Sequence, residues 1–267
     1  MNNSKSIKVG VVGGAGYTGG ELLRILVNHP NATIAFVHSK SKAGKFIHEV
    51  HTDLIGDTEL KFTSELSSDI DVMFLCVGHG EAKVFLAENK IDSKTKIIDL
   101  SQDHRLKSTT FVYGLPELNK EQIKKANYIA NPGCFATCIQ LGLLPLAANG
   151  LLKDDVHITA TTGSTGAGQS LSTTSHFSWR QNNLSIYKAF EHQHLNEIGQ
   201  SLTQLQKGFS NDLNFIPYRG AFTRGIIASL YTNCELSIEK IEELYKSYYS
   251  GHPFVHISKT AIDLKQI

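Results

Sequence analysis

A glycine-rich turn near the start of the chain restricts its fold more than any other feature. The run Ile7–Val12 is typical of a buried strand, glycines stand at 13, 16 and 19, and a helical segment then extends to His29 and Pro30. Glycine lets the backbone approach a ligand, and a helix N-terminus offers N–H groups to a pyrophosphate. The order therefore predicts a dinucleotide site, with a tight turn without ligand as the alternative. The residues expected to form it are Gly13, Gly16, Tyr17, Thr18 and Gly19.

The end of the second expected strand, residues 33–37, bears on the choice of dinucleotide. An NAD site usually has Asp or Glu there, which binds the ribose 2′-hydroxyl. Here the chain continues His-Ser-Lys-Ser-Lys, and Ser39, Lys40 and Ser41 suit a 2′-phosphate instead. The sequence favours NADP over NAD, and the alternative is a solvated basic loop.

Strands and helices continue to alternate through the first half of the chain. Apolar runs at 71–77 and 96–100 are typical of buried strands. The alternation predicts an α/β fold with a doubly wound parallel sheet, whose ligands lie at the carboxyl ends of its strands. Gly78 and Arg105 follow two such ends. Arg105 would bind a phosphate or carboxylate there, unless it only forms a surface ion pair.

A second strand, turn and helix surround Cys134. The residues YIA precede Asn131, Pro132 and Gly133, and a long apolar segment of helical period then runs to Gly150. We therefore expect Cys134 in the first turn of a helix, where N–H groups and the helix dipole favour the thiolate. A nucleophilic thiol and a small buried hydrophobic residue are both open. A zinc pair with Cys138 is a weaker option, because no second ligand pair of standard spacing accompanies it.

The second half differs in composition. A strand-like run at 157–162 enters a loop of small residues containing Ser164 and Gly166, which suits close approach of a ligand or another domain. Apolar spacing from residue 195 predicts a helix on which His194 and Glu197 are neighbours. A carboxylate beside a histidine suits a general acid/base, while a metal motif or a solvated polar face are the alternatives. Two further strands are expected at 213–217 and 225–231, with arginines at 219 and 224 flanking the turn between them.

Charge and cysteine usage narrow the class of protein. The 267 residues include 26 Lys and Arg against 25 Asp and Glu, for a net charge of +1, which argues against a nucleic-acid platform. No apolar run is long enough to cross a membrane, and the N-terminus lacks the apolar core of a signal peptide. The four cysteines show no disulfide pattern, so a reducing cytoplasm is expected, and no metal site is expected.

Several stretches together resemble one family of enzymes. GGAGYTGGELLR, IIDLSQDHRL, VYGLPELNK, IANPGCFAT, TGSTGAG and EHQHLNEI occur in family order and cover nearly the whole chain. In these the chain resembles the N-acetyl-γ-glutamyl-phosphate reductases of arginine biosynthesis and, more distantly, the aspartate-semialdehyde dehydrogenases. The resemblance implies an NADP-binding Rossmann domain at 1–133 and an α+β catalytic and oligomerisation domain at 134–267. It also implies a small-molecule substrate and a homodimer or homotetramer, for which the uncovered sheet of the second domain would supply an interface.

The resemblance also implies roles for individual residues. Cys134 would attack the acyl phosphate and form a thioester, which a hydride from NADPH reduces. His194, with His192 and Glu197 close by, would supply the acid/base function. Substrate binding would fall to Arg105, Asn131 and Arg224, with Arg105 on the phosphate. Besides the first turn, Gly78, Ser164 and Gly166 would contact the cofactor.

The chain departs from the family at several points. Gly78, Gln169 and Ala221 stand where the family usually has proline, arginine and proline. Family members also continue beyond Ile267 with a strand and a helix that return to the first domain, and cofactor affinity and packing would depend on such a segment. Three other functions stay open: an aspartate-semialdehyde dehydrogenase, a non-catalytic NADP-binding redox module that senses through Cys134, and a thiol hydrolase or acyltransferase. The VYGLPEL stretch and the paired histidines weigh against the first, and the glycine-rich turn against the last.

Overall fold

The computed structural model describes residues 6–266, which form two compact units. Unit 1 contains the residues up to 114 together with 121–131, and unit 2 contains 115–120 and the residues from 132 onward. Helix α3 (Pro116–Lys125) contributes to both units, and the non-helical backbone of Asn119 interrupts it.

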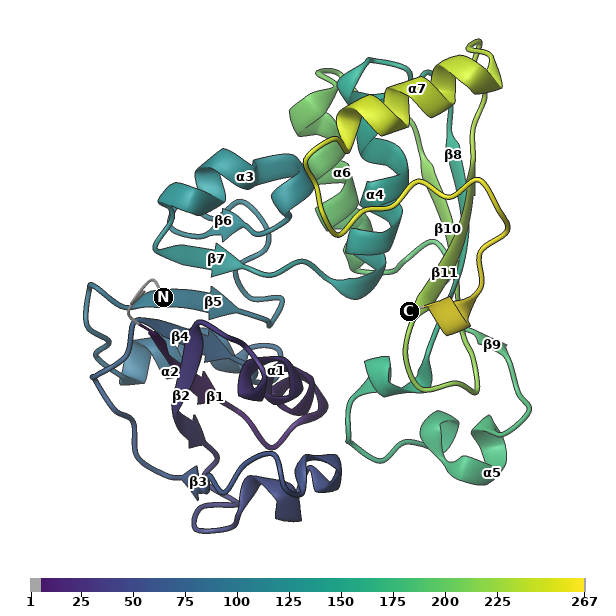
Figure 1. Ribbon diagram of the computed structural model, residues 1–267. Helices are drawn as coiled ribbons and strands as arrows, with labels where there is room; N and C mark the ends of the chain where they lie inside the picture. The colour runs from purple at the N-terminus through teal and green to yellow at the C-terminus, as the bar shows by residue number, and fades with distance from the viewer. Residues whose placement is uncertain (1–5, 267) are drawn as a thin grey trace. The chain divides into compact units, whose positions relative to one another are not determined.

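Seven parallel strands form the sheet of unit 1, in the order β3-β2-β1-β4-β5-β7-β6 (Figure 1). The order reverses between β1 and β4, which is where doubly wound sheets bind their ligands. The predicted α/β sheet is confirmed. The strands are β1 (Ile7–Val12), β2 (Ala32–His38), β3 (Phe62–Thr63), β4 (Val72–Leu75), β5 (Lys96–Asp99), β6 (Val112–Tyr113) and β7 (Tyr128–Ala130).

Helices cover both faces of this sheet because successive residues of a strand point to opposite faces. Val9 and Val11 of β1 pack in one cluster with Leu23 of α1 (Tyr17–Val27). Val12 packs in the other cluster with Ala82 of α2 (Glu81–Glu88). A strand that is buried on both sides reads as an uninterrupted apolar run, which is why β1 is so clear in the sequence.

The sheet of unit 2 has the order β11-β8-β10-β9. β8 (Val156–Thr162) and β10 (Leu213–Arg219) are parallel, while β9 (Ser185–Ile186) and β11 (Ile226–Tyr231) run antiparallel to their neighbours. The strands expected at 213–217 and 225–231 are present. However, both pair with β8, so residues 220–225 cross the end of β8 instead of forming a hairpin turn.

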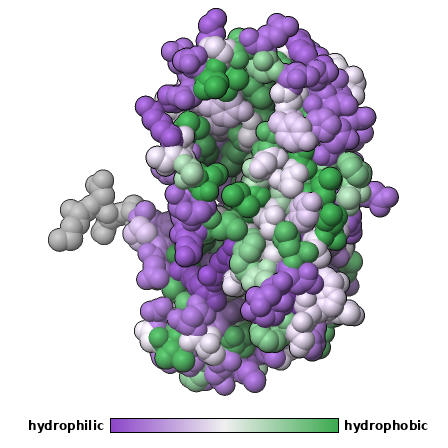
Figure 2. Space-filling view, turned by 90° about the vertical axis from the view of Figure 1, so that its right-hand side faces the viewer, coloured by the Kyte–Doolittle hydropathy of each residue, from purple (hydrophilic) through white to green (hydrophobic). Residues whose placement is uncertain are grey.

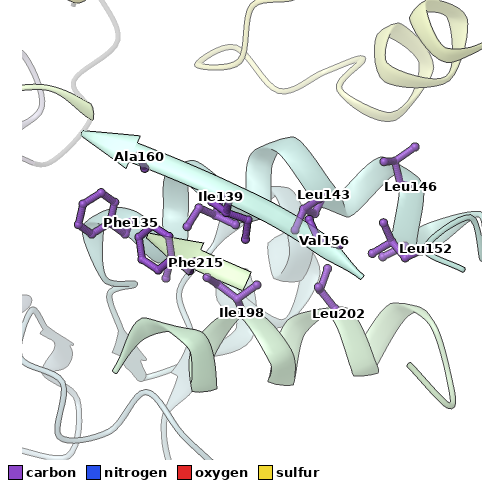
Figure 3. Close-up of a cluster of buried hydrophobic side chains, with 13 residues drawn as sticks. Phe135, Ile139, Leu143, Leu146, Leu152, Val156, Ala160, Ile198, Leu202 and Phe215 are labelled. Atoms are coloured by element: carbon purple, nitrogen blue, oxygen red, sulfur yellow. The ribbon is translucent and has the colours of Figure 1, made fainter. Parts of the chain in front are cut away.

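The core of unit 2 lies between one face of this sheet and the helices α4 (Cys134–Ala148) and α6 (His194–Leu205). Figure 3 shows Phe135 and Phe215 together at one end of this core, with Ile198 and Leu202 of α6 along it. The rings of Phe135 and Phe215 meet edge to face, with their centroids 5.1 Å apart. Because Phe135 is 1% exposed, it fixes the first turn of α4 and the thiol that precedes it.

Pro145 stands inside α4 without interrupting it. Proline has no N–H, so the carbonyl of Leu141 loses its usual helical partner. The hydroxyl of Tyr249 donates to that carbonyl at 2.5 Å, and Tyr245 donates to the next one, of Gly142. Tyr245 belongs to α7 (Ile238–Tyr248), and the hydroxyl of Ser237 caps this helix by accepting the N–H of Lys240. The C-terminal helix thereby supports the helix that bears Cys134.

The other face of the unit 2 sheet is open. On β8 and β11 the outward positions His157, Thr159, Ile227 and Tyr231 are all exposed. Figure 2 views the molecule from the side on which these strands lie in Figure 1, and apolar residues appear among polar ones there. Within residues 6–266 no helix is both long and apolar enough to cross a membrane.

Candidate active site

A cavity of about 520 Å³ lies in unit 1, at the carboxyl ends of β1, β2 and β4. Ser39, Lys40 and Ser41 line it on one side, and apolar side chains of α2, including Val84 and Phe85, line another. A cavity with an apolar wall and a basic, hydroxyl-rich edge suits an adenine ring beside a phosphate. The residues expected to select NADP therefore border this cavity.

The glycine turn beside this cavity has the shape of a phosphate cradle. Gly13 has φ +76°, and a Cβ there would lie 2.5 Å from the carbonyl oxygen of Cys76. The N–H groups of Gly13 and Gly14 both donate to the carbonyl of His38, at 3.1 and 3.2 Å. A diphosphate would therefore meet the first turn of α1, where Gly16 is the N-cap and no described side chain caps the helix.

His51 supports this turn, and no sequence motif pointed to it. Its Nε2 lies 2.8 Å from the carbonyl oxygen of Gly14, in a buried position, and its ring packs against Gly20. The contact joins residues 37 positions apart. A contact between segments so far apart in the chain produces no local pattern, so nothing in the sequence indicated it.

His38 at the end of β2 and Gly78 after β4 also lie at this edge of the unit 1 sheet. Burial, reinforced by the charge of Lys40, lowers the pKa of His38. The N–H of Gly78 donates to Glu81 Oε2 at 3.0 Å, so this donor is already engaged within the turn that begins α2.

Cys134 is the first residue of α4 and is exposed, with Gly133 as the N-cap. This confirms the prediction that the thiol lies in the first helical turn. Cys138, one turn further on, and Cys76 are different, because burial raises their pKa to about 11 and about 12. Cys134 is therefore an accessible sulfur at a helix N-terminus, whereas burial favours the protonated thiol at Cys138 and Cys76. Within the described residues, no group of three or more His, Cys, Asp or Glu side chains is arranged to hold a metal.

Glu197 and His194 lie against the turn that precedes Cys134. Both belong to the first turn of α6, as the spacing predicted. Glu197 is 3% exposed; its Oε2 accepts the N–H of Gly133 at 2.9 Å, and its Oε1 lies 3.9 Å from His194 Nε2. A Cβ on Gly133 would lie 2.3 Å from that Nε2. The glycine is therefore required so that the imidazole can approach the main chain next to the nucleophile.

His192 lies beneath the same turn. It is 4% exposed, and its ring meets those of Phe135 and His194 edge to face at 5.3 and 4.6 Å. Burial lowers the pKa of His192 to about 4, with the charges of His194 and Lys188 acting in the same direction. A neutral His192 packs well in this apolar environment, while His194 lies nearer to the cysteine turn.

Arg105 is 7% exposed, within unit 1. Its Nε donates to the carbonyl of Asn131 at 2.8 Å and one terminal nitrogen donates to Leu100 at 3.0 Å. The guanidinium therefore holds the main chain that leads to Cys134, and any contact with a substrate would use its other donors. Asn131 itself is exposed, and its N–H donates to Asp99.

The remaining expected residues lie in one loop region of unit 2. Ser164 donates its hydroxyl to the carbonyl of Phe222 at 3.1 Å, and Gly166 belongs to the short 3-10 helix that Ser164 begins. Arg224 is exposed in the crossing segment between β10 and β11. Unit 1 thus contains the candidate nucleotide cavity, and unit 2 contains Cys134, His192, His194 and Glu197.

Comparisons with known proteins place this arrangement in a class. Residues 8–126 match the model described as "Semialdehyde dehydrogenase, NAD binding domain", and residues 134–267 match "Semialdehyde dehydrogenase, dimerisation domain". The chain belongs to the semialdehyde dehydrogenase family.

Curated relatives narrow the family further. N-acetyl-gamma-glutamyl-phosphate reductase of Flavobacterium johnsoniae is 58% identical over 98% of this chain and 82% of its own length. The protein of the same name from Christiangramia forsetii is 56% identical, with the same coverage. The enzyme group predicted from the sequence motifs is confirmed.

Solved structures show the same fold at low identity. Aspartate semialdehyde dehydrogenase II from Vibrio cholerae, described as complexed with ASA, has a TM-score of 0.69 at 16% identity, over 90% of this chain and 79% of that one. Aspartate semialdehyde dehydrogenase with NADP from Candida albicans has a TM-score of 0.66 at 15% identity, over 90% and 76%.

Proposed function

We propose that this chain reduces N-acetyl-γ-glutamyl phosphate to N-acetylglutamate semialdehyde and phosphate with NADPH, in arginine biosynthesis. The observation that carries the chemistry is an exposed cysteine at a helix N-terminus, with a histidine and a buried carboxylate against the same turn. Relatives named for this reaction are 54–58% identical over nearly the whole chain. A domain boundary at 133/134, with catalysis and oligomerisation in the second domain, is part of the proposal.

The first half of the reaction uses the thiol. The Cys134 thiolate attacks the γ-acyl carbon, the bond to phosphate breaks, and phosphate leaves with the electron pair, so that a thioester remains on Cys134. The N–H groups of Phe135 and Ala136, in the first turn of α4, are oriented to stabilise the oxyanion of the tetrahedral intermediate. The N–H of Gly133 does not serve there, because Glu197 accepts it.

The second half needs a hydride and a proton. The glycine turn and Ser39, Lys40 and Ser41 would hold NADPH, which would supply the hydride that reduces the thioester carbon. The resulting oxyanion collapses to the aldehyde and releases the thiolate of Cys134. His194 exchanges the proton with the oxyanion and thiol, while Glu197 orients it. His192 supports His194 by packing, and Arg105, Asn131 and Arg224 contact the substrate.

The residues at the edge of the cavity in unit 1 support NADP rather than NAD as the cofactor. The end of β2 bears a histidine, two serines and a lysine where an acid would bind a ribose hydroxyl. Gly78, Ser164 and Gly166 belong to the same proposed cofactor contact set.

The assembly and location proposed are a homodimer or homotetramer in the cytoplasm. A family domain described as a dimerisation domain covers residues 134–267, and β8 and β11 leave a sheet face open. A second copy of this chain is the partner that such a face fits.

Phosphate-dependent reduction of NADP⁺ with N-acetylglutamate semialdehyde tests the function. Turnover that requires phosphate, and that Cys134→Ala abolishes while NADPH binding persists, is expected. The control Cys138→Ala should retain most of the activity. Faster turnover with aspartate semialdehyde, or activity in Cys134→Ala, would refute the assignment.

A further inference from the structure

His51 is a buried histidine of unit 1 that the proposed mechanism does not use. It is 6% exposed and lies between the short 3-10 helices Ile47–Glu49 and Thr52–Leu54. Its Nε2 is 2.8 Å from the carbonyl oxygen of Gly14. A carbonyl oxygen only accepts hydrogen bonds, so Nε2 carries the proton and donates it. The side chain thus holds one peptide group of the glycine turn from 37 positions further along the chain.

Other segments hold the rest of Gly14. Its N–H donates to the carbonyl of His38 at 3.2 Å. A Cβ on Gly14 would lie 2.2 Å from Cγ1 of Val37, and a Cβ on Gly19 would lie 2.6 Å from Cα of Gly14. β2 and α1 therefore hold the N–H and the α-carbon of Gly14, and His51 holds its carbonyl group. Since a peptide group is planar, the direction of this carbonyl also sets the direction of the next N–H in the turn.

The same imidazole ring packs against α1. A Cβ on Gly20 would lie 2.6 Å from Cε1 and 2.7 Å from Nδ1 of His51, so a side chain at this position would displace the ring. Gly20 lies close to the start of the helix, because its N–H donates to the carbonyl of the N-cap Gly16 at 2.9 Å. His51 therefore contacts both the glycine turn and the helix that follows it, and fixes one relative to the other.

An ion pair attaches the segment that carries His51 to α1. Arg24, one helical turn after Gly20, donates from Nε and from a terminal nitrogen to the two carboxylate oxygens of Asp53, the second contact at 2.8 Å. The hydrogen bond from Arg24 lowers the pKa of Asp53 to about 2, so the pair is ionised at neutral pH. A bidentate pair fixes geometry as well as charge. The short helix that follows His51 is thereby held in place.

We infer that His51 is a positioning residue for the dinucleotide and determines how tightly the glycine turn binds the diphosphate. The inference rests on the proposed function in one respect, that this turn binds the diphosphate of NADP. Several main-chain N–H groups bind such an anion together, so their directions must agree. His51 is buried and its donor is engaged, so it acts through the main chain and not by contact with the ligand. Ser39, Lys40 and Ser41, at the proposed 2′-phosphate end, do not depend on it.

Calorimetry with two ligands tests this role. NADP⁺ contains the diphosphate, whereas adenosine 2′-phosphate keeps the adenine and the 2′-phosphate but lacks it. His51→Leu removes the donor and should raise the Kd for NADP⁺ about tenfold, while the Kd for adenosine 2′-phosphate changes less than about twofold. His51→Gln, whose amide nitrogen can take the place of Nε2, should recover most of the affinity for NADP⁺. His48→Leu is the matched control in the same segment, because the ring of His48 stacks on Phe46 at 5.1 Å and not on the turn.

An equal loss of affinity for both ligands would show that His51 only stabilises the fold of unit 1, and would overturn the inference. Unchanged NADP⁺ affinity in His51→Leu, an equal loss in His48→Leu, or no recovery in His51→Gln would overturn it too. Where adenosine 2′-phosphate binds too weakly to measure, the recovery in His51→Gln decides. Because no turnover is needed, a wild type that binds NADP⁺ without reducing it refutes the proposed function and still tests His51. A wild type that binds no NADP⁺ refutes the role of His51.

Discussion

Two helix N-termini carry the proposed sites of this chain, and they are built in opposite ways. α1 begins after a glycine turn in which Gly13 has a positive φ and no room for a Cβ, and no described side chain caps the first N–H groups of the helix. α4 begins at a side chain, Cys134, and its turn is held by Glu197 across 64 positions of sequence. The first terminus is shaped mainly by its own residues, whereas the second depends on another helix.

The difference follows from what each terminus has to do. A diphosphate needs several main-chain donors at close range, and glycine is sufficient to expose them. A thioester needs one sulfur in a fixed place, next to a proton carrier and oxyanion donors, so side chains from α6 must meet the turn. Substitutions that remove the support of one terminus should leave the other intact.

The strongest test of the cysteine turn is Glu197→Ala. Loss of the carboxylate leaves the buried N–H of Gly133 without its acceptor and releases His194, so we expect kcat to fall about 100-fold. Glu197→Gln keeps an acceptor oxygen and should lose only about 10-fold. The KM for NADP⁺ should not change in either variant. A Glu197→Ala enzyme with normal kcat would mean that the turn holds its shape without α6.

The matching test of the glycine turn is Gly13→Ala. An alanine at φ +76°, with its methyl 2.5 Å from the Cys76 carbonyl, must displace the backbone, and the KM for NADP⁺ should rise about 30-fold. Gly56→Ala is the control, because Gly56 has φ +86° but nothing within 4 Å of the added methyl. The alkylation rate of Cys134 by iodoacetamide should be the same in all three proteins. If both glycine variants raise the KM equally, conformational strain rather than the cradle is responsible.

The sequence predicted what depends on local residues. β1, the glycine turn and α1 follow one another, and buried parallel strands read as apolar runs, so the sheet of unit 1 was foreseen. Cys134 at the start of α4, and His194 beside Glu197, were likewise matters of spacing. The two-residue strands β3, β6 and β9 were not foreseen, since pairs of residues carry no periodicity.

What the sequence left out depends on contacts between distant segments. Neither His51 beneath the glycine turn nor Glu197 accepting from Gly133 follows from any local pattern. Arg105 was expected to bind a phosphate, and only the structure shows two of its donors directed to main-chain carbonyls. The insertion of β8 between β10 and β11 is equally invisible, because strand order is decided by the packing of whole faces.

Lys40→Met tests the part of the proposed dinucleotide site that would bind the 2′-phosphate. Lys40 lines the cavity in unit 1, and an exposed cation near a 2′-phosphate should contribute roughly tenfold in affinity. The KM for NADP⁺ should rise by about that factor while the KM for NAD⁺ does not. Lys42→Met, in the same turn but outside the cavity lining, is the control. A similar change for both dinucleotides would place the lysine elsewhere than at the 2′-phosphate.

The smallest expected effect concerns pH and the support of the cysteine turn. Burial holds the pKa of His192 at about 4, below its ordinary value of 6.5, so the unfolded chain takes up a proton first as the pH falls. Stability is therefore full above pH 6.5 and declines as the pH falls from there toward 4. Between pH 8 and pH 6 this histidine should cost about 1 kcal/mol of unfolding free energy.

Urea titrations of the wild type and His192→Asn at the two pH values measure this cost. The variant should lose about 1 kcal/mol less than the wild type on acidification, even if it is less stable at both pH values. His192 packs under the cysteine turn and not under the glycine turn, so the effect belongs to unit 2. NADPH binding should accordingly keep the same pH dependence in the variant. Equal pH slopes of stability would show that His192 has the same pKa in the folded and the unfolded chain, and that the cysteine turn tolerates a charge beneath it.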